Sequence, residues 1–130
     1  MFDEAQHLIA VVDDDEEVRN ATENLLQSYG FLSGSFASAE EFLNSGQVGR
    51  VDCLVTDVQM PGMSGVDLHA LLIQRGSCPP TIFVTAFPDD RVRARAESAG
   101  AVAFLAKPFD ADRLIECVNV ALGARGDGVI

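Results

Sequence analysis

The sequence predicts an α/β fold in which a doubly wound parallel sheet of five strands is covered by five helices. The first observation is that apolar runs of strand length alternate along the chain with segments of helical pattern. The second is that these runs are apolar almost throughout, as is typical of strands that have helices on both faces. Strands and helices that alternate in this way form parallel sheets with right-handed crossovers.

The first half of the chain contains two of the expected strands. The apolar run Leu8–Val12 is the first strand, and an amphipathic helix that Gly30 can close follows it. A weaker strand is expected within residues 31–36. Ser38 and Glu41 then have the spacing of a capping box, which predicts the start of a short helix.

The second half of the chain contains the other three strands, over residues 51–57, 79–86 and 101–106. A helix is expected after each of them. The residues that begin or end these helices are Ser64 with Asp67, Pro88 with Asp89 and Asp90, Gly100, Asp110 and Gly123.

Length and charge narrow the functional classes. The 130 residues fit one domain, which we assign to residues 1–122, with a glycine-rich, flexible tail over residues 123–130. A net charge of −11 argues against direct nucleic acid binding by this chain, because phosphate contacts need clustered lysines and arginines. The run Leu8–Val12 is too short for a signal peptide core or a membrane span, so we expect a cytoplasmic protein without membrane contact.

Polar residues stand where four of the expected strands end. Asp13 and Asp14 follow the first strand, Asp57 ends the third, Thr85 lies at the end of the fourth and Lys107 follows the fifth. In an open parallel sheet the carboxyl ends of the strands share one edge, and ligands bind there. Crowded carboxylates repel one another, and a bound Mg2+ ion, which prefers oxygen ligands, relieves that repulsion. The pattern therefore predicts a magnesium site at this edge.

Lys107 is the only lysine of the chain, since the other eight basic residues are arginines. An ammonium group at the end of a buried strand can pair with a carboxylate or with a phosphoryl oxygen. Asp15, Glu16 and Glu17 need no such role, because negative charge in the first turn of a helix complements the helix dipole. The acidic run near the start of the chain therefore divides between the metal site and the first helix.

Taken together, the motifs at the strand ends resemble the receiver domain of two-component response regulators. They are Asp13 with Asp14, Asp57 in the run DVQMPGMSG, Thr85 with Ala86, and Lys107 with Pro108. The resemblance extends from about Leu8 to Leu122, and it is greatest to receivers that precede helix-turn-helix DNA-binding domains in longer proteins. It implies a flavodoxin-like sheet with the strand order 2-1-3-4-5.

The resemblance implies a role for each residue of the site. Asp57 would be the phosphoacceptor, which takes a phosphoryl group from a sensor histidine kinase or a phosphotransfer protein. Asp14 and Asp57 would bind Mg2+ (or Mn2+) directly, Asp13 through water and Gln59 through its backbone carbonyl. Lys107 would pair first with Asp57 and then with the phosphoryl group. The protein would thus be a signalling switch and not an enzyme with substrates of its own.

The resemblance also implies how the phosphoryl group changes the protein. Thr85 and Phe104 would be the switch pair, in which the hydroxyl turns toward the phosphate and the ring moves into the vacated space. The helix over residues 89–100 and the fifth strand would then form the surface for a homodimer or an output domain, with its arginines available for salt bridges. The bond between Lys107 and Pro108 is expected to be cis.

Two positions depart from the commonest pattern of such domains. Gln59 and Phe87 are expected to flank the phosphoryl group and to modulate the lifetime of the phosphorylated state by changing the access of water.

Two other functions remain open at this point. A magnesium-dependent phosphatase of the haloacid dehalogenase type also uses an aspartyl nucleophile at a strand end. It needs a second carboxylate two residues later, however, where this chain has Gln59. A receiver-like fold can also serve as a binding module without phosphorylation.

Overall fold

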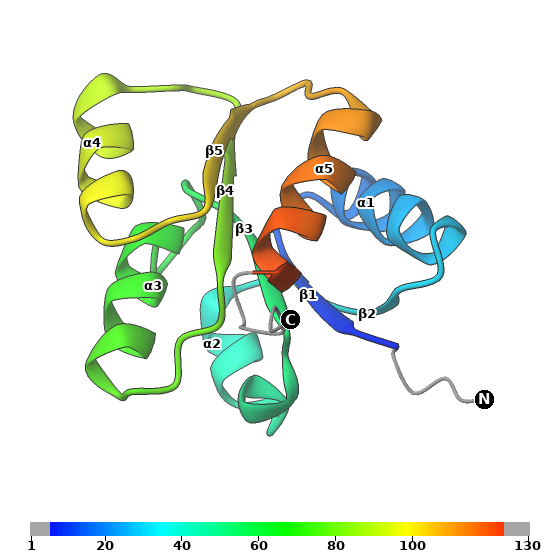
Figure 1. The fold of residues 1–130 in the computed structure, drawn as a ribbon. Helices are drawn as coiled ribbons and strands as arrows, with labels where there is room; N and C mark the ends of the chain where they lie inside the picture. Colours follow the sequence, from blue (N-terminus) through cyan, green and yellow to red (C-terminus); the bar gives the residue numbers. More distant parts are fainter. Residues whose placement is uncertain (1–5, 124–130) are drawn as a thin grey trace.

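The computed structural model of the protein describes residues 6–123. Its centre is a parallel sheet with the strand order β2-β1-β3-β4-β5, which confirms the predicted fold class and the flavodoxin-like order (Figure 1). The strands are β1 (Leu8–Val12), β2 (Leu32–Phe36), β3 (Cys53–Asp57), β4 (Thr81–Thr85) and β5 (Ala103–Ala106). The helices are α1 (Glu16–Ser28), α2 (Ala39–Leu43), α3 (Gly65–Gln74), α4 (Asp90–Ser98) and α5 (Ala111–Leu122).

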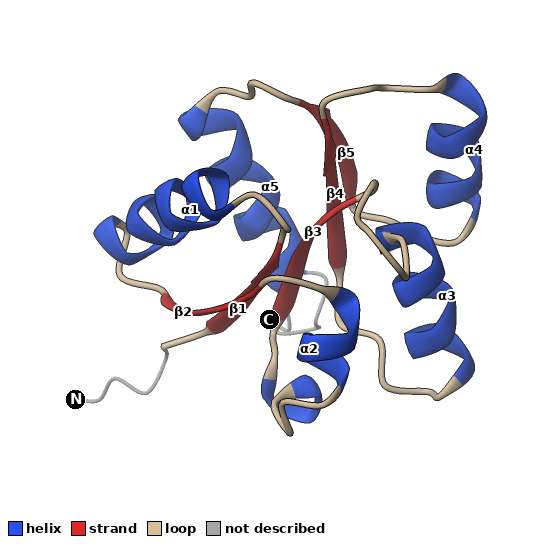
Figure 2. Ribbon diagram, turned by 180° about the vertical axis from the view of Figure 1, so that it is seen from behind, coloured by secondary structure: helices blue, strands red, loops and turns tan. Residues whose placement is uncertain are grey.

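Helices cover both faces of the sheet, as the apolar strands predict. α1 and α5 lie on one face, and α2, α3 and α4 lie on the other (Figures 1 and 2). Under α1 and α5 the core is built around Leu26, Leu114 and Val118. Under α2 and α3 it is built around Phe42 and Leu68. Burial on both faces fixes β1, β3 and β4 firmly, so the ends of these strands form a rigid support for side chains.

The helix α4 is attached by a smaller apolar cluster than the other helices. This cluster contains Phe83, Phe104 and Ala96, and Ala96 is the one fully buried residue of α4. A partly exposed ion pair between Arg95 and Asp67, at 3.6 Å, links α4 to α3. Elements with few buried apolar contacts open most easily, so α4 is the helix that is easiest to displace.

Side-chain caps fix where the helices begin. The hydroxyl of Ser38 accepts the backbone N–H of Glu41, and that of Ser64 accepts the N–H of Asp67, both at 3.0 Å. Both capping predictions are therefore confirmed. Asp110 occupies the capping position of α5, but its side chain makes no capping hydrogen bond.

Some segments differ from the sequence-based expectations. A short 3-10 helix, η1 (Val48–Arg50), precedes β3 and was not expected. β4 begins only after Pro79 and Pro80, which lack the N–H groups that a strand donates to its neighbour. The tail expected over residues 123–130 lies, apart from Gly123, outside the described residues. Within the described part of the chain, no helix is both long and apolar enough to cross a membrane.

Candidate phosphoacceptor and metal site

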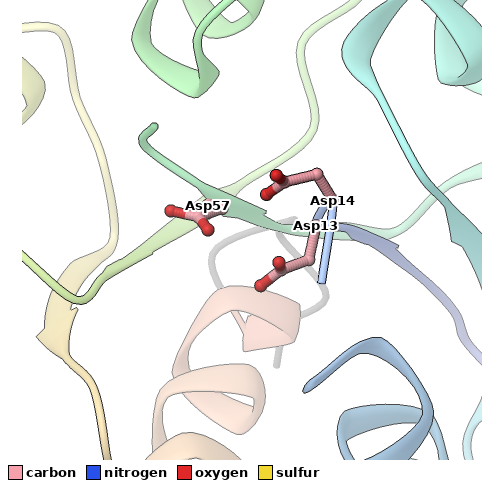
Figure 3. Close-up of side chains that lie close together, drawn as sticks. All are labelled: Asp13, Asp14 and Asp57. Atoms are coloured by element: carbon pink, nitrogen blue, oxygen red, sulfur yellow. The ribbon is translucent and has the colours of Figure 1, made fainter. Parts of the chain in front are cut away.

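The polar residues at the strand ends gather at one edge of the sheet because the strands are parallel and in close register. Val12 of β1 pairs with Thr56 of β3, which places Asp13 beside Asp57. Thr85 of β4 pairs with the last residue of β5, so Lys107 follows directly beside it. Figure 3 shows the carboxylates of Asp13 and Asp57, with that of Asp14, at the ends of β1 and β3.

Three carboxylates form the acidic part of the site. One oxygen from each of Asp13, Asp14 and Asp57 lies within 4.8 Å of the other two. Asp13 and Asp57 are buried, at 2% and 7% exposure, whereas Asp14 is exposed. Carboxylate oxygens are the ligands that Mg2+ and Mn2+ prefer, and Mg2+ keeps several of its waters. The donor set, with one carboxylate open to water, therefore fits a hard divalent cation.

Lys107 joins the two buried carboxylates. Its Nζ donates to Oδ2 of Asp13 at 2.8 Å and to Oδ2 of Asp57 at 2.9 Å. Burial disfavours the charged ammonium, but the hydrogen bonds to the two carboxylates outweigh this effect and raise the pKa of Lys107. The contact with Asp57 was implied by the family resemblance. The equally short contact with Asp13 was not foreseen.

Both oxygens of the Asp57 carboxylate are held in place. Oδ2 accepts from Lys107, and Oδ1 accepts the backbone N–H of Gln59 at 3.1 Å. Burial raises the pKa of Asp57 and the nearby Asp13 carboxylate adds to the rise, while the hydrogen bonds from Lys107 and Gln59 act in the opposite direction. Asp57 is thus an oriented, poorly solvated carboxylate with a cationic partner.

The other site residues surround an open cavity of about 270 Å³. Asp14, Asp57 and Lys107 line it, together with Gln59 and Phe87. The Phe87 side chain is 70% exposed, which is unusual for a large aromatic residue. The structure therefore brings both residues that depart from the common pattern to the cavity beside Asp57.

Thr85 and Phe104 lie behind the cavity on neighbouring strands. The Thr85 side chain is buried, and its oxygen accepts the backbone N–H of Phe87 at 3.1 Å. The Phe104 ring is also buried, beside Phe83, and the guanidinium of Arg93 lies over it at 5.1 Å from the ring centre. The bond between Lys107 and its proline is cis, as the resemblance implied.

Gly65 also belongs to the site, although it is not among the residues predicted from the sequence. It begins α3 directly beside the backbone of Asp57, and its N–H donates to the carbonyl of Val58 at 2.9 Å. A Cβ at Gly65 would lie 3.0 Å from the backbone carbonyl carbon of Asp57 and would overlap the carbonyl oxygen. The glycines of the run DVQMPGMSG were a signal, because glycine permits close backbone approach.

Comparisons with known proteins show which family this chain resembles. The family model described as response regulator receiver domain matches residues 9–119. The response regulator protein TodT of Pseudomonas putida is 38% identical over 115 residues, which cover 88% of this chain and 51% of TodT. The transcriptional regulatory protein FixJ of Azorhizobium caulinodans is 39% identical over 115 residues, which cover 88% of this chain and 54% of FixJ. The chain thus spans about half the length of these curated relatives.

Solved structures of response regulators also resemble this chain. The crystal structure of FixJ-N is 36% identical and superposes with a TM-score of 0.81, covering 95% of this chain and 96% of that one. The structure of the response regulator StyR is 39% identical with a TM-score of 0.85, covering 92% of this chain and 61% of that one.

Proposed function

This chain belongs to the response regulator receiver domain family, and we propose that it is a phosphorylation-dependent switch whose phosphoacceptor is Asp57. The observation that carries the proposal is the position of Asp57, which is held by Lys107 at 2.9 Å and lies beside two further carboxylates. Phosphoryl transfer needs alignment and neutralisation of charge more than it needs covalent chemistry from the protein. The site supplies both.

The transfer itself needs few groups. A carboxylate oxygen of Asp57 attacks the phosphorus of a phosphohistidine, an O–P bond forms, the P–N bond breaks, and the released imidazole takes up a proton. Lys107 can keep its contact with Asp13 while it turns from Asp57 to a phosphoryl oxygen. Asp14, Asp57 and the Gln59 carbonyl would hold Mg2+ (or Mn2+) directly and Asp13 would hold it through water, and the ion would supply charge neutralisation when bound.

The switch would then respond through Thr85. Its hydroxyl has a hydrogen free to donate, because it accepts from Phe87 in the structure, and it can turn toward a phosphoryl oxygen. Movement of Thr85 leaves space that the Phe104 ring can fill. The weakly anchored α4 can follow, and the surface of α4 and β5 would contact an output domain or a second copy of the chain.

The surface beside the site suits a protein as the phosphodonor. A largely apolar groove of about 590 Å³ runs between α1 and α5, and Leu25, Pro108 and Phe109 line it. The groove reaches Ala86 and Lys107, which also line the phosphoacceptor cavity. A sensor histidine kinase or a phosphotransfer protein that packs into the groove would bring its phosphohistidine to Asp57.

The remaining parts of the proposal concern the protein as a whole. We assign the receiver domain to residues 1–122 and place the protein in the cytoplasm, without membrane contact. We propose that this chain does not bind nucleic acid directly, because its net charge is −11. Its chemistry would be limited to its own phosphorylation and dephosphorylation.

Intact-mass measurement after incubation with acetyl phosphate and Mg2+ tests the central claim. The wild type should gain the mass of one phosphoryl group, and Asp57→Ala should not. Asp112→Ala, which removes an exposed carboxylate of α5, is the matched control and should gain the mass as the wild type does. No gain in the wild type would favour a binding module, and steady turnover of an aryl phosphate would favour a phosphatase.

The proposed modulation by Gln59 and Phe87 has its own test. Both side chains line the cavity around Asp57, so truncation should change the access of water to the acyl phosphate. Gln59→Ala and Phe87→Ala, made singly, should change the rate of dephosphorylation measured by the loss of the phosphoryl mass. Equal rates in both variants and the wild type would exclude modulation by these residues.

A further inference from the structure

We propose that Glu40 of α2 is a positioning residue of the phosphoacceptor site, which acts by holding the loop between β3 and α3. This inference rests on the proposed function. The loop covers residues 58–64 and connects the phosphoacceptor strand to the helix that begins behind it. Its conformation decides where the backbone of Gln59 lies relative to Asp57.

The two ends of the loop are fixed by hydrogen bonds close to Asp57. At one end the N–H of Gln59 donates to the Asp57 carboxylate, and at the other the N–H of Gly65 donates to the carbonyl of Val58. The buried side chain of Met60 adds an apolar anchor in the core under α2. These contacts leave the tip of the loop to be held by something else.

Glu40 supplies the contact at the tip. Its Oε2 accepts the backbone N–H of Met63 at 3.0 Å, although the two residues are 23 positions apart in the sequence. Among the hydrogen bonds of the described residues, this one alone joins the tip of the loop to α2. It involves an ionised acceptor, and such hydrogen bonds are stronger than those between neutral groups.

The packing at the neighbouring residue supports the same contact. Gly62 has a φ of +80°, a backbone conformation that suits glycine. A Cβ at Gly62 would lie 2.8 Å from Oε2 and 3.4 Å from Oε1 of Glu40. The carboxylate of Glu40 therefore fills the space that the missing side chain leaves. Two independent features of the loop, one donor and one glycine, are matched to this one carboxylate.

The position of the contact explains how it could affect the site. Met63 lies on the helix side of the tip, one residue before Ser64, the capping residue of α3, so the tether fixes the chain between the tip of the loop and the start of the helix. Loss of the tether should let the loop sample conformations in which the Gln59 backbone turns away from Asp57. The carbonyl of Gln59, which we propose as a metal ligand, would then be available for only part of the time.

The neighbouring Glu41 provides a matched control. It is also an exposed glutamate of α2, and its carboxylate also accepts one backbone N–H, from Ala37. That hydrogen bond supports the start of α2 and does not reach the loop. Glu41→Ala therefore reports any general effect of weakening α2, whereas Glu40→Ala removes the tether in addition.

Two measurements by NMR test the proposal without phosphorylation. The first is amide exchange at Met63, which should become about fivefold faster in Glu40→Ala, the factor expected for loss of one hydrogen bond. The second is Mg2+ titration followed at the Gln59 amide, in which the Kd should rise by at most the same factor, because the apparent affinity falls only with the fraction of molecules whose loop is displaced. Glu41→Ala should stay near the wild type in both, and Glu40→Gln, which keeps an acceptor oxygen, should fall between.

Each outcome has a definite meaning. Unchanged Met63 exchange in Glu40→Ala, or an equal change in Glu41→Ala, would show that the tether does not hold the loop. Faster exchange with an unchanged Mg2+ Kd would show that the loop is held but that the metal site does not depend on it. Either result overturns the proposal. Failure of the wild type to accept a phosphoryl group would instead count against the proposed function. The Mg2+ titration would still test whether Glu40 positions the loop at the metal site.

Discussion

Replacing Gly65 by alanine should damage the phosphoacceptor more than it damages the fold. The added Cβ would lie 3.0 Å from the carbonyl carbon of Asp57, 3.1 Å from Oγ1 of Thr56 and in overlap with the Asp57 carbonyl oxygen. Non-bonded carbon atoms settle about 3.5–4.0 Å apart, and the overlap with the carbonyl oxygen demands the larger shift, so the start of α3 and the end of β3 must separate by about 1 Å or more. The atoms that must move are backbone atoms on both sides, and no flexible side chain can absorb the change.

This displacement should change both the free energy of unfolding and the rate of phosphorylation. Overpacking of a well-packed region typically costs about 1–3 kcal/mol, and we expect a loss of this size in the free energy of unfolding of Gly65→Ala. Misplacement of a reacting group by about 1 Å can reduce a reaction rate about 100-fold. The rate of phosphorylation by acetyl phosphate should therefore fall far more than the stability does, because the displaced atoms belong to Asp57 itself.

Urea denaturation and intact-mass kinetics measure the two effects, and Gly49→Ala is the matched control. Gly49 lies in η1, has no atom within 4 Å of the added Cβ and does not have a positive φ. The control should keep the wild-type rate and should be as stable as the wild type or slightly more so. If Gly65→Ala is phosphorylated as fast as Gly49→Ala, the close approach of α3 to Asp57 does not control the rate of phosphorylation, and the prediction is wrong.

Two further predictions concern the metal site and the buried histidine. Mg2+ should raise the melting temperature of the wild type, because a ligand that binds only the folded state stabilises it, and Asp14→Ala should lose most of that rise in a thermal melt. Burial lowers the pKa of His69, so the imidazole of His69 stays neutral in the folded protein. In the unfolded chain the same imidazole takes up a proton below about pH 6.5. Stability should therefore fall as the pH drops through this range, and urea denaturation at several pH values should show a smaller fall for His69→Leu.

The parts of the fold that the sequence predicts are those that depend on local patterns. Four apolar runs become β1, β3, β4 and β5 because they are largely apolar on both faces, whereas β2 is a partly exposed edge strand. Polar residues end three of these runs, at Asp13, Asp57 and Lys107. Parallel topology then brings these ends to one edge of the sheet, whatever the details of packing. The convergence of the three side chains thus follows from pattern and topology together.

The parts that the sequence does not predict depend on distances between distant segments. The ion pair of Lys107 with Asp13 depends on how far a flexible side chain reaches past the ends of β4 and β3, which no spacing in the sequence encodes. The contact of Glu40 with Met63 depends in the same way on the placement of α2. The sequence does contain the glycines that mark close approach at Gly62 and Gly65, but it does not say what approaches them.

The charges of the site explain why these residues occur together. Three carboxylates and one ammonium carry a net charge of −2 when all are ionised, which is the charge that one divalent cation balances. In the proposed switch, a phosphoryl group on Asp57 would replace a charge of −1 by about −1.5 to −2, and the neutral hydroxyl of Thr85 could not offset that increase. Lys107 and the cation would have to offset the added negative charge. Thr85 would instead respond to the direction of the new phosphoryl oxygens. In the proposed switch, the residues at the buried strand ends would therefore neutralise charge, and the weakly anchored α4 would carry the signal.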